Sequence, residues 1–123
     1  MRPEIAELWA TALESGLYEQ GKGQLVLHHT LPTPSKYCCL GVLCDLADKA
    51  GVKTPFGEDQ GSYGWNFGTN GATLPKVVLE WAGMETSTGE FGPGPIDSLM
   101  IHNDNGDPFS EIAAIIRAHV EEL

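Results

Sequence analysis

Apolar residues recur every three or four positions near the start of the chain, which is the spacing of one helical face. Pro3 suits the first turn of a helix, and Ser15-Gly16 suits its end. The pattern therefore predicts an amphipathic first helix that packs by one stripe. The apolar positions are Ile5, Leu8, Trp9, Ala12 and Leu13.

A second helix is predicted between Ser35, which can cap it, and Gly51, which can end it. At about 100° per residue, Cys39 and Leu43 fall on one apolar line, so Cys39 is expected in the core. Cys38 falls toward the polar side, yet the first two turns are apolar nearly all round. This helix is therefore expected to be the most deeply buried.

Two more helices follow the same rules. Thr73 can cap a third helix that Gly83 ends. Asp107 and Pro108 can start a last helix, whose broad apolar stripe runs to Leu123.

Two short runs have the composition of strands. The first is QLVLH at residues 24–28, and the second is LMIH at residues 99–102, followed by the turn-forming NDNG at residues 103–106. The predicted order is α-β-α, a glycine-rich middle, then α-β-α. We expect an α+β fold in which about four helices pack on a small sheet, as a single domain over residues 1–123.

The charge of the chain limits its partners. The formal charge is −10, from 17 acidic and 7 scattered basic residues. Direct binding of nucleic acid is not expected, because it relies on clustered Lys and Arg. No membrane association is expected either, since no run approaches the roughly 18 apolar residues of a span and Glu4 and Glu7 interrupt any signal peptide. We expect a cytoplasmic protein whose acidity favours basic partners.

All three cysteines lie within positions 38–44. A helix N-terminus stabilises thiolate, so Cys38 could be a nucleophile with His102 as its base, oriented by Asn103 or Asp104. The order of these residues loosely resembles papain-like peptidases and cell-wall amidases, without their flanking signature. We favour packing, because free cysteines are among the most buried residue types, and we expect no disulfide.

The sequence offers no metal site with the expected spacing. Cys38, Cys44, His28 and His29 lack the ligand spacing of structural zinc sites. The run NDNGD at residues 103–107 does not fit a calcium loop, because isoleucines fall at the first and last ligand positions. We therefore expect no metal and no cofactor.

The middle of the chain is the expected binding surface. Residues 52–73 contain five glycines together with the alternating aromatic residues Tyr63, Trp65 and Phe67. Such rings can stack on a ligand or anchor a protein partner, or they can close the open side of a small core. The turn His102-Asn103-Asp104 is expected to complete the surface.

Several stretches of the chain form a recognisable set. They are WATALESGLYEQ at residues 9–20, YCCLGVLCDLA at 37–47, LPKVVLEWAG at 74–83, Asn103-Asp104, and FSEIA at 109–113. Together they resemble a family of short proteins encoded by tailed bacteriophages, especially those of actinobacteria, with CCLGVLC as the specific core. The resemblance implies no activity. His102 stands where the family pattern has leucine, so histidine catalysis is not implied.

The resemblance implies the bacterial host cytoplasm as the location. We predict a non-enzymatic phage accessory protein that binds a host protein or a small molecule such as a signalling compound, in host takeover or anti-defence. Two alternatives stay open: a cysteine-dependent hydrolase or transferase that uses Cys38 and His102, and a minor virion or assembly component. The sequence does not specify the ligand, the host target or the oligomeric state.

Overall fold

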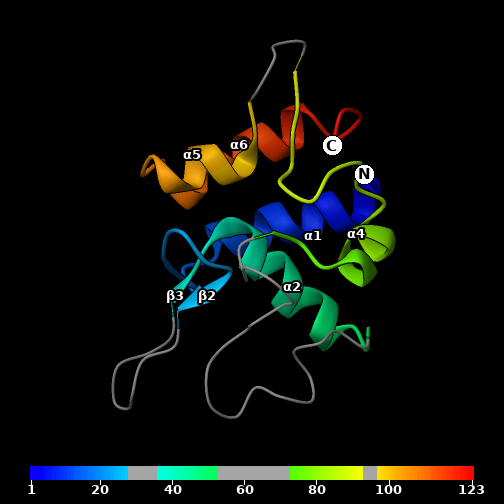
Figure 1. Ribbon diagram of the computed structural model, residues 1–123, viewed down its shortest axis with the longest axis horizontal. Coiled ribbons are helices and arrows are strands. Elements are labelled where there is room, and N and C mark those ends of the chain that lie inside the picture. Colours follow the sequence, from blue (N-terminus) through cyan, green and yellow to red (C-terminus); the bar gives the residue numbers. More distant parts are fainter. Residues whose placement is uncertain (28–35, 53–72, 93–96) are drawn as a thin grey trace.

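Helices and a small sheet make up the part of the chain that the computed structural model describes, which is residues 1–27, 36–52, 73–92 and 97–123, and the sheet lies at one edge of the helices (Figure 1). The helices are α1 (Pro3–Glu14), α2 (Cys39–Lys49), α4 (Lys76–Ala82), α5 (Leu99–Asp104) and α6 (Phe109–Ala118). The strands are β1 (Glu19–Gln20), β2 (Val26–Leu27) and β3 (Lys36–Tyr37). The fold is α+β, as the sequence pattern predicts.

Helices α1, α2, α4 and α6 lie where the periodicity predicts them, but α2 and α4 begin later than expected, and α6 ends at Ala118 instead of running to Leu123. Lys36 and Tyr37 form β3, so α2 begins at Cys39 with Cys38 as its cap. The predicted cap, Ser35, lies outside the described residues. In α4 the cap is Pro75 and not Thr73, and Gly83 ends the helix in the left-handed conformation, with φ of 70°.

The predicted strand at residues 99–102 is wrong, because these residues begin helix α5. Ser98 caps the helix, and its Oγ accepts a hydrogen bond from the Ile101 N–H at 3.2 Å. Leu99 and Asn103 are four residues apart, so both face the interior from one side of the helix, where they are fully buried. The described elements therefore follow the order α-β-β-β-α-α-α-α instead of two α-β-α units.

The sheet is built on β3, which lies between its two neighbours. β1 pairs with β3 in parallel and β2 pairs with it antiparallel. The backbone before β2 lies close to the first turn of α2. The Cys38 N–H donates to the Leu25 carbonyl at 3.1 Å, and a Cβ at Gly41 would lie only 1.8 Å from the same oxygen. Only glycine lets helix and strand approach this closely.

Buried residues lie around most of the circumference of α2. Seven of its eleven residues are buried, compared with five of twelve in α1, and among the described helices α2 is the most deeply buried, as predicted. Cys39 has no exposed surface, as predicted, and its carbonyl accepts the indole N–H of the buried Trp9 at 2.9 Å. Helix α6 lies along α1 (Figure 1), where Arg117 pairs with Glu7 at 2.8 Å and with Glu14 at 2.7 Å.

Replacing Gly41 tests the close approach of α2 and the backbone before β2. A Gly→Ala change inside a helix ordinarily stabilises by about 0.5–1 kcal/mol. Here we expect Gly41→Ala to destabilise the protein by about 3 kcal/mol, because the methyl group would overlap the Leu25 carbonyl. Urea unfolding followed by circular dichroism measures the change, and unchanged or increased stability would contradict this packing.

Candidate functional site

The predicted aromatic surface cannot be placed. Tyr63, Trp65 and Phe67 lie outside the described residues, as do His28 and His29. The remaining predicted binding residues, His102, Asn103 and Asp104, all lie on α5 and not in a turn after a strand. They have three different surroundings.

Asn103 is fully buried, so the prediction that it belongs to the binding surface is wrong. Its Oδ1 accepts the Cys39 N–H at 3.1 Å and the Gln20 side-chain amide at 3.0 Å. Its Nδ2 donates to the Gly21 carbonyl at 2.8 Å. Both ends of the amide are thus occupied by groups of the protein, and Asn103 joins α5 to the first turn of α2 and to the end of β1.

Asp104 is exposed and fixes a neighbouring loop. Its Oδ1 accepts the Gly23 N–H at 3.0 Å. The carboxylate does not orient His102, contrary to the predicted Cys-His-Asp arrangement, because both ring nitrogens of His102 contact other carboxylates. Asp104 therefore has a structural role in holding the segment between β1 and β2.

The three cysteines are buried free thiols. Cys38 caps α2, and its Sγ accepts the Gly41 N–H at 3.4 Å. Burial raises the pKa of Cys38 to about 11, and it raises the pKa values of Cys39 and Cys44 well above that of an ordinary thiol. A neutral thiol is a weak nucleophile, so this geometry gives Cys38 a capping role and does not support thiolate catalysis.

His102 bridges two carboxylates that sequence reasoning did not identify. Its Nε2 lies 2.8 Å from Asp97 Oδ1, and its Nδ1 lies 2.5 Å from Asp107 Oδ2. A neutral imidazole has one N–H and cannot donate to both partners, whereas the imidazolium can. The hydrogen bond to Asp107, opposed in part by desolvation and supported by both negative charges, raises the pKa of His102 above its usual value.

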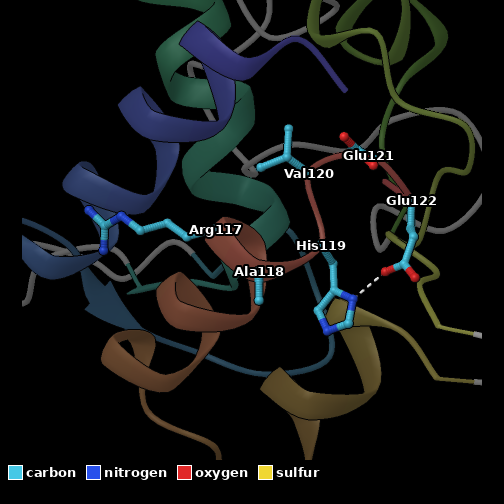
Figure 2. A pocket seen from close by; sticks show the side chains of 6 residues that line it. All are labelled: Arg117, Ala118, His119, Val120, Glu121 and Glu122. Carbon is cyan, nitrogen blue, oxygen red and sulfur yellow. Dashed lines mark hydrogen bonds and ion pairs between the residues drawn. The ribbon is translucent and has the colours of Figure 1, made fainter.

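Phe91 packs close to two histidines. Its ring centroid lies 5.6 Å from that of His102 and 4.8 Å from that of His119. His119 follows α6, and its Nδ1 contacts the Glu122 carboxylate (Figure 2). The sequence pattern does not predict this cluster, because Phe91, His102 and His119 come from three separate segments that only the tertiary structure brings together.

A small hollow beside Phe91, here called the Phe91 pocket, is lined mainly by carboxylates. Its volume is about 210 Å³. No lysine or arginine is among its described lining residues, which are Glu85, Thr86, Glu90, Phe91, Gly92, Asp97 and Glu122. Glu122 also borders a second hollow of about 430 Å³ formed by residues 117–122. In Figure 2, the Arg117 side chain of this second hollow points away from His119 and Glu122.

Backbone hydrogen bonds hold the walls of the Phe91 pocket. The Phe91 N–H donates to the Asp97 carbonyl at 3.1 Å, and the Glu85 N–H donates to the Leu123 carbonyl at 2.7 Å. Glu90 forms an antiparallel bridge with Ser98. The pocket is therefore formed by connecting segments that are tied to α5 and to the end of the chain after α6.

Two other kinds of site find no support in the described ranges. No group of three or more His, Cys, Asp or Glu side chains there is arranged to hold a metal ion. None of the described helices combines the length and the apolar character needed to cross a bilayer.

Thiol alkylation tests the structural role of Cys38. At neutral pH we expect iodoacetamide to modify Cys38 in the folded protein much more slowly than in the urea-unfolded chain, because burial disfavours the thiolate. Mass spectrometry locates the modified residue. Cys38→Ser should still fold, since serine is a good helix cap. Faster alkylation of Cys38 in the folded protein than in urea would restore the nucleophile hypothesis.

Truncating Asn103 tests its structural role. Asn103→Ala leaves the buried Cys39 N–H and Gly21 carbonyl without these partners, so we expect a loss of about 3 kcal/mol in the free energy of unfolding. The neighbouring exposed Asn105 is the control, and Asn105→Ala should change stability by less than about 0.5 kcal/mol. Equal effects in urea unfolding would show that the Asn103 contacts are not stabilising.

Comparison with known proteins identifies the family of the chain without assigning an activity. No curated protein and no solved structure matches the sequence. A family model described as a domain of unknown function, DUF8296, matches residues 1–120. Because the match covers nearly the whole chain, the protein belongs to the DUF8296 family.

Proposed function

We propose that the protein acts by binding a partner that places a cationic group in the Phe91 pocket. The observation that carries this proposal is the lining of the pocket, in which the carboxylates of Glu85, Glu90, Asp97 and Glu122 surround a hollow beside an aromatic ring. A guanidinium or ammonium group can pair with such carboxylates. The net charge of −10 would attract basic surfaces over longer distances.

The size of the pocket favours a protein partner over a free small molecule. Sites for drug-sized ligands usually measure about 300–1,000 Å³, whereas the Phe91 pocket measures about 210 Å³. One arginine or lysine side chain is a better match to this volume. The resemblance to short tailed-phage proteins makes a protein of the bacterial host, met in its cytoplasm, the partner that we propose. The protein would then be a phage accessory protein in host takeover or anti-defence.

The proposed activity is binding and not catalysis. A cysteine-dependent hydrolase would need an accessible thiolate next to a base with a free nitrogen. Cys38 is buried with a raised pKa, and both nitrogens of His102 are engaged by Asp97 and Asp107. The structure therefore gives no reason to propose chemistry at the cysteines.

A charge-matched pair of variants tests the Phe91 pocket. The pocket variant is Glu85→Gln/Glu90→Gln, and the control is Glu80→Gln/Glu111→Gln, which removes the same charge from α4 and α6. The probe is a fluorescent hexa-arginine peptide at low salt, and fluorescence anisotropy measures Kd. We expect the pocket variant to bind about tenfold more weakly than the control, since two carboxylates are worth about 1–2 kcal/mol.

The same measurement can reject the proposal. Equal weakening in the two variants would show that the peptide follows net charge and not the pocket. No binding by the unsubstituted protein would contradict cation recognition itself.

A further inference from the structure

Two carboxylates of the Phe91 pocket already contact histidines within the protein. Asp97 contacts Nε2 of His102, and Glu122 contacts Nδ1 of His119. Both imidazoles pack close to the ring of Phe91. A cation that enters the pocket therefore meets carboxylates whose availability depends on neighbouring imidazole groups.

The two histidines differ in how many of their carboxylate contacts a neutral ring can keep. His119 has one carboxylate partner, and a neutral imidazole can still donate Nδ1–H to Glu122. His102 has two partners, so its neutral form must turn an unprotonated nitrogen toward either Asp97 or Asp107. Loss of a proton from His102 therefore breaks one of its two carboxylate contacts. A single N–H is enough for the one contact of His119.

The surroundings of His102 favour release of Asp97 over release of Asp107. Asp107 lies just before α6, and its contact with Nδ1 is the shorter of the two, at 2.5 Å against 2.8 Å. Asp97 lies before α5 and is also the more exposed side chain, at 48% against 33%. The His102 ring also stacks on Phe91. Asp97 is thus the partner that can turn toward the pocket.

We propose that His102 makes the Phe91 pocket pH-responsive, because its protonated ring holds Asp97 and its neutral ring frees Asp97 for the cation of a partner. This proposal rests on the proposed function. Proton and cation then compete: a higher pH strengthens binding of the cation, and bound cation favours loss of the proton from His102. The other charged groups that border the pocket are Glu85, Glu90 and Glu122.

The pH dependence of peptide binding tests the proposal. With the hexa-arginine probe, we expect the affinity of the unsubstituted protein to rise about tenfold between about pH 6 and pH 9, within the usual range of coupling between sites. His102→Gln should bind with nearly the same affinity across this range. His119→Gln changes the other histidine that packs close to Phe91; it is the matched control and should keep most of the rise.

A measurement without peptide checks the switch itself. Since folding raises the pKa of His102, its contribution to stability is complete below the ordinary histidine value of about 6.5 and is lost as pH rises through the folded value. NMR titration of the imidazole should give a pKa above about 6.5. The stability advantage of the unsubstituted protein over His102→Gln should shrink as pH rises.

The outcomes separate the two proposals. No peptide binding at any pH overturns the proposed function and the pH response that rests on it. Binding that is equally tight at both ends of the pH range, or a rise that persists in His102→Gln, overturns the pH response alone.

Discussion

The buried side chain of Asn103 determines how α5 packs against the first turn of α2 and the end of β1. Asn103 satisfies an N–H group at the first turn of α2, the amide of Gln20 and a carbonyl at Gly21. The two backbone groups, at Cys39 and Gly21, would otherwise be buried without these partners, which costs more than an ordinary hydrogen bond gains. The contacts fix the rotation of α5 about its axis. Because adjacent helical residues point in different directions, burial of Asn103 leaves His102 facing Phe91 at the edge of the core.

The CCLGVLC segment, at residues 38–44, is the part of the chain that α5 contacts through Asn103 and Leu99. Its small side chains each allow a different close contact. The Sγ of Cys38 caps α2, Cys39 fills the core and contacts the Leu99 carbonyl at 3.5 Å, and Gly41 lets the backbone at Leu25 approach. The concentration of cysteines is thus explained by space and by capping, without requiring reactive thiols.

The residues that line the Phe91 pocket lie outside the described helices and strands. Its walls come from connecting segments and from the turn after α6, and such segments commonly carry recognition on a rigid frame. The segments are held by backbone hydrogen bonds, so their carboxylate side chains are not needed to hold the backbone and can meet a partner. An acidic surface of this kind concentrates the overall negative charge of the chain at a defined place.

The sequence by itself determined the α+β class, the positions of four helices, the burial of Cys39 and the acidic character, because periodicity and composition report on each element alone. The tertiary structure decided the rest. Strand β2 lies within the predicted run at residues 24–28, whereas β1 and β3 have two residues each and form by pairing, so no local pattern predicts them. LMIH is β-prone, yet the Ser98 cap and the burial of Leu99 and Asn103 make it helical. The Phe91 pocket joins residues from 85 to 122, and only packing brings such distant segments together.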